Sequence, residues 1–510
     1  MARFTSILFP QGGGSSGIDE VPGCFADLHL DEVIATVTAA STDDHLHRLF
    51  YVPLHEISFV EHRHRVFQDL ERDETRQPIS IFVDGMATMQ RSLEQANWLP
   101  YPLQRQGGFL HAVHTYCDVV ASLRDQLARV ELTSRGLRDF ADYVAEYVAS
   151  DTFRRLASDT AAVQSALHEA RYTVHVDGLR VNVEKYDSQT DYGEEVVATF
   201  ERFASEVGED YRVAAKDHSG MSHVEEQILG CVAKLYPHAF ARLDDFCRRH
   251  KQFVESVIQR FDHEIGFYLC YLAIVRRLTS AGVNFSYPEV TAEPGALSAD
   301  EAFDLALAIK STSEAQALVS NNFHLSGLER ILVVTGPNQG GKTTFARTIG
   351  QCAYLASLGC PVPARWARFT LPDRVYTHFD RSEVLSTPHG KLEDELIRIR
   401  DILSGATATS VIIMNESLSS TTVADALLIG TEILGRIIAL RCVAVCVTFL
   451  DELAGLDQAC VSMVGEVALD ERFTRTFTFT RRRADGLAYA AALADRHGLN
   501  PDVLRRRICG

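Results

Sequence analysis

The most restrictive feature of the sequence is a glycine-rich stretch that follows an apolar run. Residues 331–334 read Ile-Leu-Val-Val, and residues 335–344 read Thr-Gly-Pro-Asn-Gln-Gly-Gly-Lys-Thr-Thr, which contains the pattern G-x-x-x-x-G-K-[ST]. Glycines let successive backbone N–H groups turn toward one phosphate, and the N-terminus of a following helix adds a partial positive charge. A glycine-rich turn that matches by chance has no reason to place Lys342 and Thr343 behind an apolar run. The pattern therefore predicts a phosphate-binding P-loop in an α/β domain.

Two side chains of this loop have expected chemical roles. Lys342 is expected to reach the β- and γ-phosphates of a nucleotide, and the Thr343 hydroxyl is expected to take one Mg²⁺ position. ATP and Mg²⁺ are thus the expected cofactors. The predicted nucleotide-binding residues of the loop are Gly336, Pro337, Asn338, Gln339, Gly340, Gly341, Lys342, Thr343 and Thr344.

The surrounding sequence changes character near residue 296. Beyond it, short β-branched runs at 330–335, 410–414 and 442–449 alternate with helical segments, a pattern typical of a mostly parallel sheet. Before it, apolar residues recur every three or four positions, as over 119–157 and 239–278, which predicts long packed helices. An alternating stretch at 172–183 around Asp177-Gly178 predicts a hairpin with a type I′ turn. We therefore expect an N-terminal segment 1–42, a helical domain 43–295 and a P-loop domain 296–510.

Composition limits the class of protein and its partners. The chain has 510 residues, 46% of them hydrophobic and 23% charged, as in ordinary globular proteins. Its net charge of −18 restricts any nucleic-acid contact to local basic patches. The eleven cysteines lack metal-ligand spacing, and the N-terminus has no signal-peptide pattern, so a cytoplasmic location is expected. The longest apolar segment, 265–275, is too short to span a bilayer and predicts a buried helix.

The extended motif resembles that of the MutS DNA mismatch-repair family, in which a Pro-Asn pair and a double glycine precede the lysine. Three further segments resemble the family: Val319-Ser-Asn321, Gly359-Cys-Pro-Val-Pro363-Ala and, loosely, residues 486–499. The resemblance implies an ATPase domain of the ABC/MutS type preceded by a mainly helical core and lever domain, with Asn321 beside the nucleotide. It also implies a homodimer gated by ATP that holds duplex or branched DNA between its arms.

The sequence departs from this family at the site itself. The strand at 410–414 leads into Asn415-Glu416, where the family has two acidic residues. Glu416 keeps the position of the catalytic base and, with Lys342, is an expected catalytic residue, while Asn415 stands on the metal side with Thr343. Phe449 replaces a histidine that senses the γ-phosphate. Leu418 and Ser420 replace two glycines of the next loop, and the segment 380–395 occupies the place of a loop that reaches the partner's ATP.

Two functions follow from these observations. The first is a slow, MutS-like ATPase that acts on DNA in repair or recombination without reading mismatches, since residues 1–45 lack the family's Phe-x-Glu wedge. The second is a regulatory scaffold that binds ATP, hydrolyses it weakly or not at all, and contacts a protein partner instead of DNA. The helical arms favour the first function, and the net acidity favours the second. The arginines considered for contacts to the DNA backbone are Arg63, Arg65, Arg124, Arg135 and Arg138.

Overall fold

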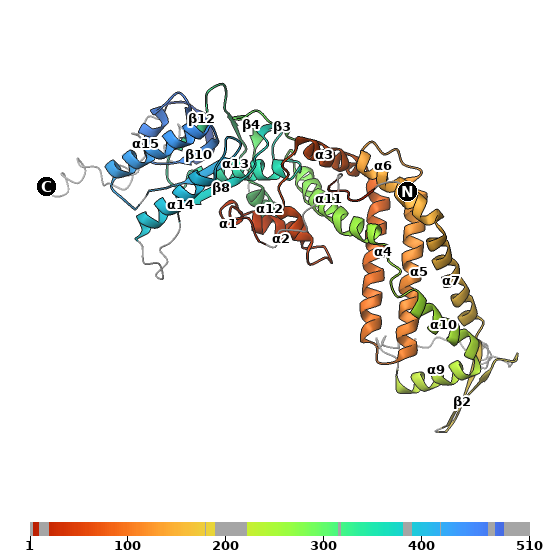
Figure 1. Cartoon of the computed structure of the whole chain (residues 1–510). Helices are drawn as coiled ribbons and strands as arrows, with labels where there is room; N and C mark the ends of the chain where they lie inside the picture. Colours follow the sequence, from red (N-terminus) through yellow and green to blue (C-terminus); the bar gives the residue numbers. More distant parts are fainter. Residues whose placement is uncertain are drawn as a thin grey trace, which may run out of the picture. The chain divides into compact units, whose positions relative to one another are not determined.

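The protein is described here by a computed structural model that covers residues 4–9, 20–178, 180–188, 222–314, 318–380, 390–418, 420–467 and 475–483. Contacts divide the chain into two compact units (Figure 1). Unit 1 comprises Met1–Arg3, Gln77–Glu131 and Asp139–Asp262, and unit 2 comprises Phe4–Arg76, Leu132–Arg138 and His263–Gly510. The domain boundaries expected at residues 43 and 296 remain predictions, because each unit is assembled from separate stretches of chain.

Unit 1 is built from helices and one hairpin. Its elements are most of α4 (Asp73–Trp98) and α6 (Arg135–Ala149), all of α5 (Pro102–Leu127), α7 (Asp151–His168), β1 (Tyr172–Asp177), β2 (Arg180–Lys185), α9 (His223–Leu235) and α10 (Pro237–Arg249), and the start of α11 (Ser256–Ser280). Helices α5, α7 and α10 pack against one another. Aromatic side chains fill the interior, where the rings of Phe140 and Phe261 stack with centroids 3.4 Å apart.

The hairpin confirms the prediction for residues 172–183, with one difference in its turn. Strands β1 and β2 are antiparallel, and Val174 pairs with Val183. Asp177 pairs with Arg180, so Gly178 is the first of the two turn residues and not the second. Gly178 has φ +58°, a value that glycine adopts without steric cost. The positive φ was expected, but the strand includes one residue more than the Asp-Gly pattern indicated.

The long helical stretches are confirmed as helical, but each is broken. The stretch 119–157 is divided among α5, α6 and α7, and the stretch 239–278 between α10 and α11. At one break the Ser150 hydroxyl accepts a hydrogen bond from the backbone N–H of Phe153 and caps α7. Such a capping contact stabilises a new helix start within a continuous apolar pattern, so the pattern alone overestimates helix length.

Unit 2 holds a six-stranded sheet and a four-stranded sheet with their helices. Its other helices are α1 (Phe25–Leu28), α2 (Leu30–Thr38), η1 (Leu46–Tyr51), α3 (Ile57–Glu71), α12 (Leu305–Glu314), α13 (Lys342–Ser357), α14 (Lys391–Gly405), α15 (Val423–Leu440) and η2 (Asp451–Gly455). Its strands are β3 (Glu289–Thr291), β4 (Leu297–Ala302), β5 (Asn321–His324), β6 (Ile331–Thr335), β7 (Trp366–Thr370), β8 (Val375–Phe379), β9 (Val411–Asn415), β10 (Val443–Val447), β11 (Cys460–Val467) and β12 (Arg475–Arg481).

The order of strands in the large sheet is β12-β11-β6-β10-β9-β8. Every neighbouring pair is parallel except β11 and β12. The small sheet has the order β3-β7-β4-β5. Strands β6, β9 and β10 confirm the three strands predicted from the sequence, and the unit has the mixed α/β character that was expected. Because β6, β9 and β10 are parallel neighbours, the loops that follow them meet at one edge of the sheet.

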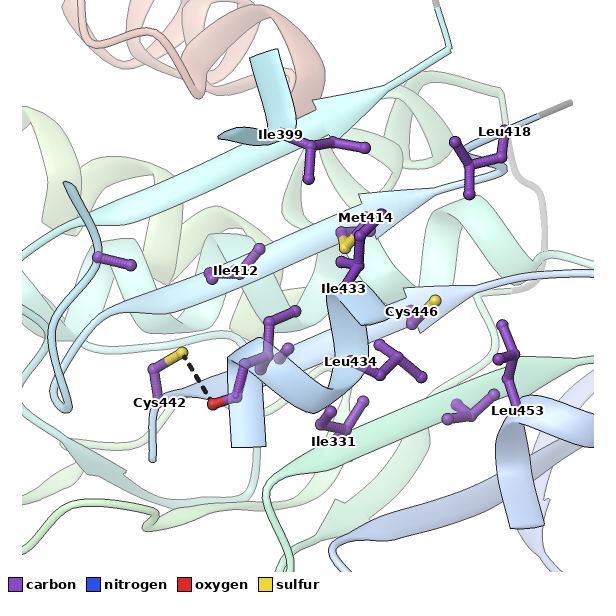
Figure 2. Packing of buried hydrophobic residues seen from close by; sticks show 14 of the residues in the cluster. Ile331, Ile399, Ile412, Met414, Leu418, Ile433, Leu434, Cys442, Cys446 and Leu453 are labelled. Carbon is purple, nitrogen blue, oxygen red and sulfur yellow. Dashed lines mark hydrogen bonds between the residues drawn. The ribbon is translucent and has the colours of Figure 1, made fainter. Parts of the chain in front are cut away.

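One face of the large sheet is covered by α14 and α15 over a continuous apolar core (Figure 2). Strand residues Ile331, Ile412 and Met414 pack there with Ile433 and Leu434 of α15. Every residue of β6, β9 and β10 is buried, which explains why these strands are continuously apolar and do not alternate. This rigid core fixes the carboxyl ends of the three strands.

Arg63 was considered a contact for a DNA backbone, and the structure contradicts that role. Its side chain is fully buried on α3, where the guanidinium donates a hydrogen bond of 2.7 Å to the carbonyl of Leu358. The guanidinium also lies over the rings of Phe9 and Phe267. The spacing of Arg63 on the helix face shared with Val60 and Val66 could have indicated burial, but an arginine without an acidic partner is rarely placed in a core.

The apolar segment 265–275 is confirmed as a buried helix, since it lies within α11 and Phe267, Tyr268 and Tyr271 are fully buried. No helix in the described part of the chain is long and apolar enough to cross a membrane.

Candidate nucleotide site

The candidate site lies where β6, β9 and β10 end. Strand β6 leads into the glycine-rich loop, β9 ends at Asn415 and β10 ends at Val447. Backbone hydrogen bonds hold these ends together: Thr448 donates to Val334 over 3.1 Å and Glu416 donates to Val447 over 3.0 Å. The residues predicted to bind nucleotide and metal are therefore brought to one edge of the sheet, although they come from three distant segments.

The loop conformation needs its glycines at two positions. Gly336 has φ +138°, and a Cβ atom there would lie 3.1 Å from the backbone nitrogen of Gly465. Gly341 has φ +88° and precedes the first turn of α13. Gln339 has φ +58°, which is uncommon for a residue with a side chain, and Gly340 donates its N–H to the Pro337 carbonyl over 3.1 Å. The chain thus forms a compact turn directly before a helix N-terminus, as anion binding requires.

Lys342 is the first residue of α13 and is almost completely buried. Its ammonium donates to three oxygens of the loop, the carbonyls of Gly336 at 3.1 Å and Pro337 at 3.3 Å and the Asn338 side chain at 3.3 Å. The Glu416 carboxylate lies 3.9 Å from the ammonium. Burial lowers the pKa of Lys342, and the charge of Glu416 opposes that change. The lysine is therefore held inside the loop by the atoms that surround a phosphate-binding position.

Thr343 and Asn415 form the expected metal side of the site. The Thr343 hydroxyl donates a hydrogen bond of 3.0 Å to the Asn415 side-chain oxygen, and Asn415 is buried. Both groups offer neutral oxygens, which Mg²⁺ accepts when phosphate oxygens and waters complete its octahedron. The chemistry of this pair fits a magnesium ion that is carried by a nucleotide, and does not fit a site that holds the ion by protein charge alone.

A cavity of about 430 Å³ opens beside these residues. It is lined by predicted site residues and by several others: Asp304, Leu307, Val319, Asn321, Gln339, Gly341, Lys342, Thr343, Thr344, Phe345, Thr348, Glu416 and Phe477. The remaining predicted residues, Gly336, Pro337, Asn338, Gly340 and Asn415, do not line the cavity and form the loop and strand end behind it.

Asn321 lies on β5 at the cavity wall, with its side chain committed to β12. Its amide nitrogen donates to the Phe477 carbonyl over 3.1 Å, and its oxygen accepts from the Phe479 N–H over 2.7 Å. Sequence reasoning missed Asp304, Leu307 and Phe477 as cavity residues. No local pattern marks them, because each lies more than twenty residues from the P-loop and reaches the cavity only through the sheet order.

The loop after β9 is held from three sides. The imidazole of His378 on β8 hydrogen-bonds the Ser417 hydroxyl over 3.0 Å, and the Ser420 hydroxyl donates to Glu395 of α14 over 3.4 Å. Leu418 is buried in the apolar core with φ +64°. Burial, assisted by the charge of Arg398, lowers the pKa of His378 to about 4. Burial, assisted by Asp380, raises the pKa of Glu395.

Two predicted features lie partly or wholly outside the described residues. Of the segment expected to reach a partner's nucleotide, Ser386 and Thr387 are not described, Gly390 precedes α14 and Glu395 is buried inside unit 2. The C-terminal resemblance at residues 486–499 also falls outside the described residues.

A parallel sheet whose buried strand runs through a glycine-rich loop into a helix, with Lys342 inside the loop, defines the class of P-loop domains. Residues 332–495 match the family model of MutS domain V. The chain belongs to the MutS family through this domain.

Curated relatives agree with this assignment over the same part of the chain. The DNA mismatch repair protein MutS of Thermotoga neapolitana is 28% identical over 197 residues, which are 37% of this chain and 25% of that protein. The same protein of Chlorobaculum tepidum is 29% identical over 192 residues, which are 37% of this chain and 22% of that protein. MutS of Rickettsia bellii is 29% identical over 197 residues, 38% of this chain and 22% of the relative. The chain thus matches about a quarter of the length of these relatives.

Proposed function

We propose that the chain is a MutS-like ATPase that binds ATP with Mg²⁺, associates with DNA as a nucleotide-gated homodimer and does not read mismatches itself. The observation that carries the proposal is the convergence of Lys342, Thr343 and Glu416 on one cavity at the carboxyl edge of a parallel sheet. The matched relatives are named DNA mismatch repair proteins, which supports a role in DNA repair or recombination.

In this proposal the chain's own residues divide the work on the nucleotide. Backbone N–H groups of the P-loop and the Lys342 ammonium bind phosphate oxygens, and Thr343 with Asn415 orients the hydrated Mg²⁺ that the nucleotide brings. The ion supplies charge compensation for phosphoryl transfer. Glu416, which lies 3.9 Å from Lys342 and is partly exposed, polarises the attacking water. The neutral Asn415 makes turnover slow.

The proposed dimer follows from the family and from the energetics of nucleotide contacts. A γ-phosphate that is bound by Lys342 of one chain and by a loop of the partner stabilises the dimer only while ATP is intact. Hydrolysis then weakens the dimer and changes the spacing of the helical arms. The membrane-free, cytoplasmic location expected from the sequence is part of this proposal.

A second candidate function is favoured by the neutral metal side of the site. Because Asn415 offers no charge to Mg²⁺ and the ring of Phe449 lies 4.6 Å from the Lys342 ammonium, the site also suits a regulatory scaffold. Such a scaffold binds ATP, hydrolyses it negligibly and contacts a protein partner in place of DNA.

Salt-dependent DNA binding separates the two functions. The full chain is titrated onto labelled duplex and branched DNA from 50 to 200 mM salt, with and without a non-hydrolysable ATP analogue. A DNA-associated ATPase releases phosphate counterions, so its affinity should fall steeply with salt and should respond to the analogue. Among the arginines considered for the backbone, Arg65, Arg135 and Arg138 are exposed, and Arg65→Gln tests one of them. Arg63→Gln is excluded as a probe because Arg63 is buried.

The control is Lys342→Met, which should abolish the response to the analogue and leave nucleotide-free DNA binding intact. DNA affinity that is absent at every salt concentration and nucleotide state contradicts the DNA-associated function and favours the scaffold.

A further inference from the structure

Phe449 lies at the end of β10 with its ring against the P-loop lysine. The Lys342 ammonium is 4.6 Å from the ring centroid, which is within the range of a cation–π interaction. The Phe449 side chain remains 54% exposed, whereas Lys342 is only 4% exposed. The ring therefore borders both the buried lysine and solvent.

The ammonium of Lys342 has no hydrogen to spare in this arrangement. It has three hydrogens, and three loop oxygens lie within 3.3 Å of it, on Gly336, Pro337 and Asn338. Its other neighbours are the ring face of Phe449 and the Glu416 carboxylate at 3.9 Å. Both of these neighbours present negative charge density, which stabilises the ammonium and gives nothing to an anion.

These neighbours affect the phosphates of a nucleotide differently. The β-phosphate of a P-loop nucleotide is bound mainly by backbone N–H groups, which Phe449 does not contact, whereas the terminal phosphate of a triphosphate depends on the lysine. To bind that phosphate, Lys342 must release a loop oxygen and exchange part of its contact with the ring. A phenylalanine offers no hydrogen-bond donor in return.

We propose that Phe449 sets the nucleotide selectivity of the site, holding the Lys342 ammonium so that a nucleoside diphosphate is bound in preference to the corresponding triphosphate. This inference rests on the proposed function, which supplies the nucleotide. It adds a direction that the function does not contain: the resting state of the protein is the diphosphate-bound state.

The test compares affinities for ADP and for a non-hydrolysable ATP analogue by isothermal titration of the full chain. Wild-type protein should bind ADP more tightly than the analogue. Phe449→His, which replaces the ring by one that donates a hydrogen bond, should shift the ratio of the two affinities about tenfold toward the analogue, the factor expected for one charge-assisted hydrogen bond. Phe449→Leu, which removes the ring and adds no donor, should shift the ratio in the same direction by about threefold.

The matched control is Phe477→His, since Phe477 is a partly exposed phenylalanine that lines the same cavity. It should change both affinities by the same factor and leave their ratio unaltered. A ratio that stays within twofold of wild type in both Phe449 variants overturns the selectivity proposal while ADP and the analogue still bind. Wild-type protein that binds neither nucleotide overturns the proposed function itself, and the two failures are therefore distinct.

Discussion

Asn415 is the residue at which the chemistry of the site departs most from an acidic metal side. Its side-chain oxygen accepts from the Thr343 hydroxyl over 3.0 Å, so the geometry of an oxygen pair is present without the charge. Glu416, the next residue, has φ +53° and turns its carboxylate toward Lys342. The adjacent pair thus separates two roles, orientation by a neutral amide and polarisation by a carboxylate.

Restoring the charge should restore metal affinity. We expect Asn415→Asp to lower the Mg²⁺ concentration that supports half-maximal hydrolysis and to speed turnover roughly 5- to 150-fold, because one well-placed charge near phosphoryl transfer contributes on the order of 1–3 kcal/mol. Glu416→Ala should abolish hydrolysis and leave ATP bound. Phosphate release measured across a Mg²⁺ series checks both. An unchanged rate and Mg²⁺ dependence in Asn415→Asp would favour the scaffold function.

His378 gives the protein an acid-sensitive residue. Its pKa of about 4 in the folded state lies below the ordinary value of 6.5, so the unfolded state binds the proton more readily. The stability that depends on neutral His378 is therefore complete above pH 6.5 and is lost as pH falls toward 4, by about 2 kcal/mol between pH 7 and 5. His378→Asn, which keeps a polar atom near Ser417, should flatten that part of the profile. Urea midpoints at the two pH values check this, and equal losses in both proteins would contradict it.

At the scale of single residues, contiguous patterns were informative and distant contacts were not. The P-loop residues and Glu416 were identified because motif order and chemistry coincide within short segments. The ring of Phe449 over Lys342 joins positions that lie more than a hundred residues apart, and only the strand order brings them together.

At the scale of elements, the loop after β9 shows how a residue with a side chain occupies a glycine-like conformation. Leu418 has φ +64°, which costs an L-residue roughly 1–2 kcal/mol. Its side chain is 5% exposed and packs among Met414, Leu434 and Leu453 in the apolar core (Figure 2). Burial of a leucine contributes about 1.5–3 kcal/mol, so packing offsets the backbone cost and anchors the loop that carries Glu416.

This balance predicts an unusual order of stability. Leu418→Ala should destabilise by about 2–4 kcal/mol, because it loses the packing and keeps the strained φ. Leu418→Gly should be less destabilising than Leu418→Ala by about 1 kcal/mol, since glycine relieves the strain.

The matched pair is Leu434→Ala and Leu434→Gly on α15, in the same core with helical backbone, where glycine should be the worse substitution by about 1 kcal/mol. Chemical denaturation of the four variants gives the order. The same order at both positions would contradict a strained Leu418.

The same scale explains which elements the sequence predicted. Strands β6, β9 and β10 were located because they are short apolar runs that end in turns or polar residues. The breaks between α5, α6 and α7 were missed because apolar spacing continues across them and capping residues such as Ser150 are also common inside helices. The four-stranded sheet was not predicted, since β4 reads Leu-Ser-Ala-Asp-Glu-Ala, which has no β-branched residue.

At the scale of the whole molecule, the family assignment rests on one domain. The match at residues 332–495 lies within unit 2, and the matched relatives extend about four times farther than the matched region. The pairing of this domain with helical elements was anticipated from periodicity. The composition of each unit from separate stretches was not, because periodicity reports local structure and not which segments share a core.

The central claim, that unit 2 binds ATP through its P-loop, is tested most directly by isothermal titration of the full chain with Mg²⁺-ATP. Wild-type protein should show saturable binding of one nucleotide per chain, and Lys342→Met should weaken it by about 100-fold, because two charge-assisted contacts to phosphate are lost. Lys310→Met, which changes an exposed lysine outside the cavity, should bind as wild type does. Equal ATP affinity in wild type and Lys342→Met, with both proteins folded, would contradict the account.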